Sequence, residues 1–159
     1  IIAVQNQMRN YIMYNMIIQG TQNQKLISYV ERVYNYLGLS EFEDCLIDLD
    51  FVKKCAGGAG GYCDGDDETI NVEIARQDLV GRIPMKDLMI NVAHELVHVQ
   101  QMASGRLVNK GFVFRDDNPT VMTTKQIFDG KEYVGVNYKD QPWEIEAYSL
   151  ENIIYNACK

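Results

Sequence analysis

The chain has 159 residues, of which 47% are hydrophobic, 23% are charged and only 3 are prolines. This composition is typical of one ordered globular domain over residues 1–159, and it excludes a disordered tail, a fibrous repeat or a pair of large domains. The 22 acidic and 15 basic residues give a net charge of −7. We therefore expect neither nucleic acid nor an anionic membrane as a partner.

The first two segments of the chain have the spacing of helices. Apolar residues recur every three or four positions over 4–18 and over 23–37, and Gly20 and Gly38 stand where helix ends are expected. Polar residues interrupt the first segment, so it is expected to pack on the domain and neither to span a membrane nor to act as a signal peptide.

The middle of the chain predicts a small sheet followed by a helix. In order, we expect a strand over 45–51, a glycine-rich link over 56–61, an acidic turn over 64–68 and a strand over 69–74. The acidic turn lacks the spacing of a calcium-binding loop and is expected to be solvated. Pro84 then opens a helix that Gly105 ends.

The last part of the chain predicts short strands and one more helix. The expected elements are a strand over 112–114, a hairpin of 125–128 with 133–138 around Asp129-Gly130, and a helix over 142–157. The Asp-Gly pair favours a type I′ turn. Helices and strands that occur in separate groups, without a regular βαβ repeat, indicate an α+β fold.

Four cysteines are too few for a disulfide framework, and none forms a CxxC pair. Cys55 and Cys63 flank the glycine run. They either pair across a hairpin or remain free thiols, and the sequence leaves both alternatives open.

Both histidines of the chain lie in one motif, His94-Glu95-Leu96-Val97-His98, on the expected central helix. Side chains four residues apart share a helix face, so the two imidazoles are placed to bind one Zn²⁺. Glu95 lies about 100° round the helix, where a carboxylate reaches a metal-bound water as a general base. Shuffling the same composition gives this pattern in roughly one sequence in 1,300, so the motif predicts a metal site.

A catalytic zinc has three protein ligands and one open position for water. No further histidine exists, so a carboxylate is expected as the third ligand, and the last helix offers Glu144 and Glu146. On a helical wheel the apolar face of this helix lies nearer Glu146. Glu146 therefore remains an alternative, either as the ligand or as a group that supports one.

The segments HELVHVQQ and PWEIEAY resemble the gluzincin zinc metallopeptidases, and most of all the small single-domain peptidases of bacterial and phage genomes. Roughly residues 45–157 are covered. The resemblance implies a zincin-like fold, with a small mixed or antiparallel sheet and the HExxH helix packed against a C-terminal ligand helix. It assigns His94, His98 and Glu144 as zinc ligands and Glu95 as the base, with Ala147 where the helices approach. Many members carry Asp or Asn four residues after the ligand glutamate, where it orients a ligand histidine, whereas this chain has Tyr148 at that position.

These observations predict a zinc metalloendopeptidase acting on a peptide or protein, with a zinc-bound water activated by Glu95. The strand over 69–74 and the glycine segment are expected to hold an extended substrate at an open sheet edge, although the glycines also suit a loose hairpin loop. Tyr133, Tyr138 and Tyr148 are candidates for a second donor to the oxyanion.

Two other interpretations remain. The first is a structural or virion-associated module that keeps the zincin fold, has little or no proteolytic activity and contacts other phage structural proteins. Glu95 argues against it, because a structural zinc site needs no base. The second is hydrolysis of a non-peptide amide, since the cleft and not the metal selects the substrate. We expect the cytoplasm of a bacterial host or a virion as the location, in preference to secretion.

Overall fold

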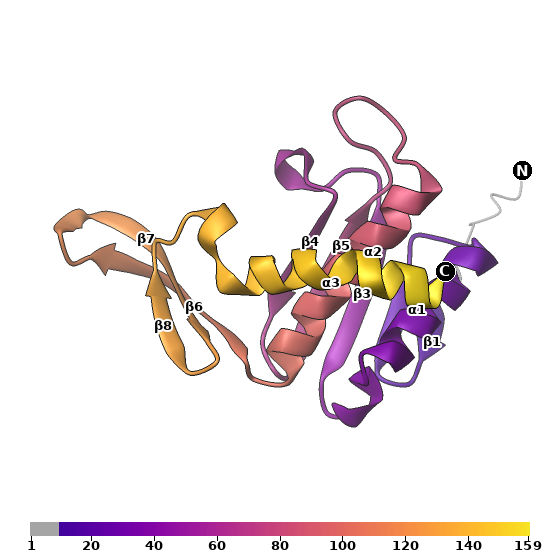
Figure 1. Cartoon of the computed structure of the whole chain (residues 1–159), viewed down its shortest axis with the longest axis horizontal. Helices are drawn as coiled ribbons and strands as arrows, with labels where there is room; N and C mark the ends of the chain where they lie inside the picture. The colour runs from indigo at the N-terminus through magenta and orange to yellow at the C-terminus, as the bar shows by residue number, and fades with distance from the viewer. Residues whose placement is uncertain (1–9) are drawn as a thin grey trace, which may run out of the picture.

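A five-stranded sheet and three α-helices form the body of the molecule, and a three-stranded sheet extends from it (Figure 1). The computed structural model describes residues 10–159. The strands are β1 (Tyr11–Met13), β2 (Met16–Gln19), β3 (Leu46–Val52), β4 (Gly61–Gly65), β5 (Thr69–Ala75), β6 (Leu107–Arg115), β7 (Asn118–Phe128) and β8 (Lys131–Val134). The helices are α1 (Gln24–Tyr36), α2 (Met85–Ala103) and α3 (Pro142–Cys158). The predicted α+β class is confirmed.

The larger sheet is mixed, with the strand order β1-β2-β3-β5-β4. Strands β2, β3 and β5 are parallel to one another, whereas the outer strands β1 and β4 are antiparallel to their neighbours. Strand β4 therefore forms one edge of the sheet. Within residues 10–159 its outer side pairs with no other strand.

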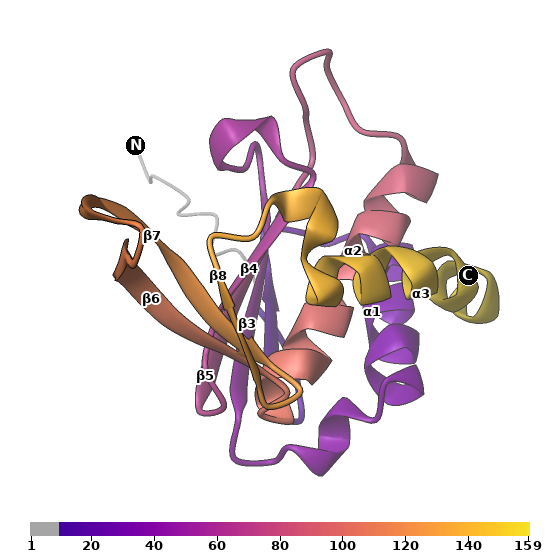
Figure 2. The ribbon, with the colours of Figure 1, turned by 60° about the vertical axis from the view of Figure 1, so that its left-hand side comes forward.

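The helices cover one face of this sheet (Figure 2). Alternate residues of β3 and β5 are buried beneath them, while the residues between point to the other face and are half-buried or exposed. The buried set on these two strands is Ile47, Leu49, Phe51, Ile70, Val72 and Ile74. This period of two is that of a strand with one face in the core.

Helix α2 lies between the sheet and α3, and it is buried on most of its surface. Helix α1 has the expected ends: the side chain of Asn23 caps its first turn, and Gly38 follows it with a φ of 65°. Pro84 precedes α2 and Pro142 is the first residue of α3, as predicted. No helix in the described part of the chain is long and apolar enough to cross a membrane.

The predicted helix over 4–18 is wrong in its described part, where β1 and β2 form a hairpin, while residues 4–9 lie outside the described residues. Met13 pairs with Met16 across a turn at Tyr14, whose φ is 51°. The apolar residues have a helix-like spacing because the buried residues of two short strands lie on either side of a tight turn. Pairing of β2 with β3, distant in sequence, then fixes the strand conformation.

The expectation that 69–74 forms an open edge is also wrong, because β5 lies inside the sheet between β3 and β4. The edge is instead β4, whose first residue, Gly61, ends the glycine segment that was also expected at the edge, and whose last two residues were assigned to the acidic turn. The four cysteines are free thiols, which answers the open question about Cys55 and Cys63.

The three-stranded sheet has the order β6-β7-β8 and is antiparallel throughout. Its β7–β8 turn has positive φ at both Asp129 (48°) and Gly130 (77°), as the predicted type I′ turn requires. The sheet leaves the body of the molecule near the start of α3 (Figure 1).

Candidate metal centre

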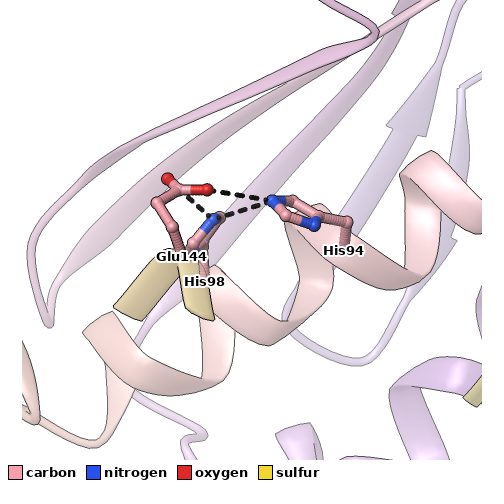
Figure 3. Close-up of side chains that lie close together, drawn as sticks. All are labelled: His94, His98 and Glu144. Atoms are coloured by element: carbon pink, nitrogen blue, oxygen red, sulfur yellow. Dashed lines mark hydrogen bonds and ion pairs between the residues drawn. The ribbon is translucent and has the colours of Figure 1, made fainter. Parts of the chain in front are cut away.

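His94 and His98 of α2 meet Glu144 from the first turn of α3 (Figure 3). The two Nε2 atoms are 3.2 Å apart, and the carboxylate of Glu144 lies 3.3 Å from Nε2 of His94 and 3.4 Å from Nε2 of His98. All three residues are buried, with at most 8% of their surface exposed. Within residues 10–159, these three side chains form the one group of histidine, cysteine, aspartate or glutamate residues that lie close enough together to hold a metal ion.

The spacing of these three side chains fits a zinc ion. Two ligands that bind zinc tetrahedrally at about 2.0–2.1 Å are separated from each other by about 3.3 Å. The observed separations of 3.2, 3.3 and 3.4 Å bracket this value. Two imidazoles and one carboxylate are also a donor set of catalytic zinc sites.

The remaining ring nitrogens have partners that set the orientation of both imidazoles. Nδ1 of His94 lies 2.9 Å from Oε2 of Glu151, and Nδ1 of His98 lies 2.8 Å from Oε1 of Gln101. Because these oxygens accept hydrogen bonds from Nδ1, each Nε2 presents a lone pair to the centre when the imidazole is neutral. The sequence reading missed both partners.

Glu146 points away from the histidines and instead binds Gln101, the hydrogen-bond partner of His98. Its Oε2 accepts a hydrogen bond of 2.8 Å from Gln101, and both of its oxygens pair with Arg106 at 3.1 Å. Arg106 also donates to both oxygens of Asp129 in the β7–β8 turn. Of the two carboxylates considered from the sequence, the structure thus places Glu144, and not Glu146, with His94 and His98.

Glu95 lies beside the centre and under the edge strand. Burial raises the pKa of its carboxyl to about 7, even though the two histidines lower it. Strand β4 passes directly over it: a Cβ atom on Gly61 would lie 2.5 Å from Oε1 of Glu95. A glycine is therefore required at position 61 for reasons of space.

The charges of the centre act on its own groups. Burial lowers the pKa of His94, but the hydrogen bond to Glu144 and the nearby carboxylates of Glu95 and Glu151 outweigh it, so the pKa is raised. Burial alone would raise the pKa of Glu144, yet in the metal-free protein hydrogen bonds from the protonated Nε2 atoms of His94 and His98 lower it to about 2. The arrangement therefore favours an ionised Glu144, whose negative charge attracts a cation, either a proton on Nε2 or a metal ion, to the space between it and the imidazoles.

Two of the three candidate tyrosines are at the centre. The hydroxyl of Tyr138 donates to Oε2 of Glu144 at 2.5 Å and lies 3.3 Å from the hydroxyl of Tyr148. The ring of Tyr148 packs edge-on against His94, with centroids 4.6 Å apart. Tyr133 packs on Trp143 instead, and no hydrogen bond joins it to the centre.

The residues that the sequence reading missed carry weak signals in the sequence. Gln101 stands three residues after His98, hence on the same face of α2. Glu151 stands about two turns after Glu144 on α3. The acidic turn, in contrast, has a local structural role, because the side chain of Asp66 accepts hydrogen bonds from the backbone of Glu68 and Thr69.

Comparisons of the chain with protein-family models, with curated proteins and with solved structures find no match.

Proposed function

We propose that the chain is a zinc-dependent hydrolase of peptide bonds, acting within extended polypeptides. The observation that carries this proposal is the position of Glu95, a buried carboxyl beside His94, His98 and Glu144 and beneath the edge strand β4 of the sheet. A site that only stabilises the fold does not need such a group, and it commonly has four protein ligands.

The zinc ion, held by His94, His98 and Glu144, would lower the pKa of a bound water and polarise the substrate carbonyl. Glu95 takes a proton from the attacking water and returns it to the departing amine as the C–N bond breaks. Tyr138 and Tyr148 are the hydroxyls placed to assist the developing oxyanion.

Strand β4 supplies the surface for the substrate backbone. The backbone N–H of Ala75 donates to Gly60 and that of Asp66 donates to Thr69, so β4 pairs with β5 through its even-numbered residues. The N–H and C=O groups of Gly61 and Cys63 consequently point to the free edge. An extended peptide that pairs with them lies beside β4, about 4.8 Å from the strand that covers Glu95.

The topology supports a zincin-like fold. The metal-binding helix lies against a mixed sheet whose edge strand β4 is antiparallel, and the C-terminal helix contributes the third side chain. This is the arrangement that the resemblance to gluzincins implies. Ala147, fully buried on α3, provides the small side chain expected where the two helices approach.

The test is hydrolysis of a denatured, fluorescently labelled protein by the zinc-loaded chain. We expect Glu95→Gln to lower the rate by about 10² to 10⁴ without abolishing zinc binding. Glu68→Gln, an exposed residue of the acidic turn, is the control and should leave the rate unchanged. If the chain binds zinc but hydrolyses none of several unfolded substrates, the structural module would be favoured over the peptidase.

A further inference from the structure

A cavity of about 430 Å³ is lined by residues of β4, of the three-stranded sheet and of the ends of α2 and α3 that meet there. Its first wall, Tyr62 to Asp64, directly follows Gly61, the residue that passes over Glu95. Its base includes three apolar residues of the core: Met102, Leu107 and Trp143. The volume is in the range of ligand-binding pockets, about 300 to 1,000 Å³. The cavity is thus large enough for a side chain of a substrate held on β4.

The second wall is shaped by a bulge in β6. Asn109 pairs with Gln126 and Phe112 pairs with Thr124, so three steps along β6 match two along β7. The extra residue falls at Gly111, whose φ is 72°. Because side chains alternate along a strand, Phe112 would point to the other face of the sheet without the bulge. The bulge therefore turns Phe112 into the cavity.

The same face continues beyond the cavity with more apolar side chains. Phe114 pairs with Met122, which places both on the face of Phe112. The exposed fractions of Phe112, Phe114 and Met122 are 69%, 61% and 56%. Three large apolar side chains on one exposed face, continuous with a cavity, mark a surface for binding.

We propose that this face selects the substrate: it takes a large apolar side chain, aromatic or long aliphatic, from an extended polypeptide whose backbone pairs with β4. The inference rests on the proposed function and gives the substrate class of the same site. The occupant is a polypeptide because the cavity continues the free edge of β4, where Gly61 and Cys63 offer backbone hydrogen bonds. A ligand without a backbone would leave that edge unused.

The charge of the cavity sharpens the selection. Asp64 is the one charged residue among the described residues that line it, and its side chain accepts a hydrogen bond from Asn109 at 3.4 Å. A second carboxylate there would be repelled. The expected order of preference at this position is therefore Phe or Leu first, then Ser, and Glu last.

The test measures binding without hydrolysis. Zinc-loaded Glu95→Gln protein is titrated against short fluorescein-labelled peptides of Gly and Ser that carry one central Phe, Leu, Ser or Glu, and fluorescence anisotropy gives each Kd. We expect the Phe peptide to bind about tenfold more tightly than the Ser peptide, as burial of an aromatic side chain predicts. Equal affinities for these two peptides, including the absence of binding by either, would overturn the proposal.

Substitutions on the two faces of the three-stranded sheet locate the effect. Phe112→Ser should reduce the preference for Phe over Ser about tenfold, and since the side chain is exposed the fold should be retained. Val134→Ser is the matched control: Val134 pairs with Lys125 on the opposite face and is 48% exposed. A loss of preference that is equal in both variants would contradict the assignment to the Phe112 face.

Hydrolysis by the wild-type chain separates this inference from the function on which it rests. Selective binding of the Phe peptide without hydrolysis of any peptide would overturn the peptidase proposal and leave the recognition surface standing. Hydrolysis of all four peptides at equal rates, with equal affinities, would overturn the recognition surface and leave the peptidase standing.

Discussion

Glu151 holds His94 from the neighbouring helix: its Oε2 lies 2.9 Å from Nδ1 of the imidazole. The carboxylate fixes the tautomer and orientation of the ring, and it makes the Nε2 atom a stronger ligand. We expect Glu151→Ala to weaken zinc binding by about 10- to 100-fold. Glu151→Gln, which keeps an accepting oxygen, should lose less.

Competition with a chelating dye at fixed pH measures this affinity. Glu43→Ala, which removes an exposed carboxylate far from the centre in sequence, controls for the change in net charge. An affinity for zinc in Glu151→Ala equal to that of the wild type would mean that the ring is held by its packing against Tyr148 alone.

Gln101 connects His98 to the Arg106–Glu146 pair and is fully buried. Gln101→Leu leaves the Nδ1 proton of His98 and one side of Glu146 without partners. We expect it to lower the free energy of unfolding by about 1–3 kcal/mol and also to weaken zinc binding. Denaturant unfolding of the metal-free chain and dye competition measure the two effects separately.

Two further variants test whether the hydrogen bonds cause these effects. Gln100→Leu changes the adjacent, half-buried glutamine and should affect neither quantity by more than about 0.5 kcal/mol. Gln101→Glu keeps an acceptor for His98 but faces Glu146 with a second carboxylate. It should therefore bind zinc better than Gln101→Leu while remaining less stable than the wild type, and the reverse order would exclude the role assigned to Gln101.

The convergence of the two histidines could be predicted because it depends only on local geometry. An α-helix places His94 and His98 on one face regardless of the rest of the fold. The ends of α2 could also be predicted, from Pro84 and Gly105. The choice between Glu144 and Glu146 depends on how α3 crosses α2. The helical wheel favoured Glu146 because it does not represent Arg106, which pairs with that carboxylate.

The errors arose where distant segments decide the conformation. Strand β4 contains two glycines in five residues and has little intrinsic preference for a strand, but pairing with β5 makes it one. Likewise, the β1–β2 hairpin has an apparent helical spacing, and its strands form because β2 pairs with β3. The periodicity of a short segment carries no information about strands, distant in sequence, with which that segment pairs.

Gly61 is constrained by Glu95 and not by its backbone conformation. A Cβ atom there would lie 2.5 Å from Oε1, 2.6 Å from Cγ and 2.8 Å from Cδ of Glu95. We expect Gly61→Ala to cost about 1–3 kcal/mol of unfolding free energy, because β4 or the carboxylate has to move. It should also reduce hydrolysis, since both groups serve the proposed reaction.

A double-mutant cycle isolates this contact. All three crowded atoms lie beyond Cβ of Glu95, so Glu95→Ala removes them. The cost of Gly61→Ala, measured by denaturant unfolding, should then be at least about 0.5 kcal/mol smaller in the Glu95→Ala background than in the wild type. An equal cost in both backgrounds would mean that Glu95 does not limit the approach of β4.

The free thiols give a prediction about pH that does not depend on metal or substrate. Burial raises the pKa of Cys55 to about 11, and the charge of Glu73 adds to the effect. Only the thiolate reacts with iodoacetamide, so at about pH 8 the native Cys55 should react at least 100-fold more slowly than an unfolded thiol, whose pKa is about 8.5. Its rate should continue to rise toward about pH 11, whereas that of the denatured chain should level off above about pH 9.

Mass spectrometry of the labelled peptides follows each cysteine separately. Burial also raises the pKa of Cys63, Cys45 and Cys158, so slow native labelling is expected at all four positions. In denaturant without a reducing agent, all four should label fully, because none is paired. Protection of Cys55 and Cys63 that persists in denaturant until a reductant is added would show a disulfide between them and contradict the structure.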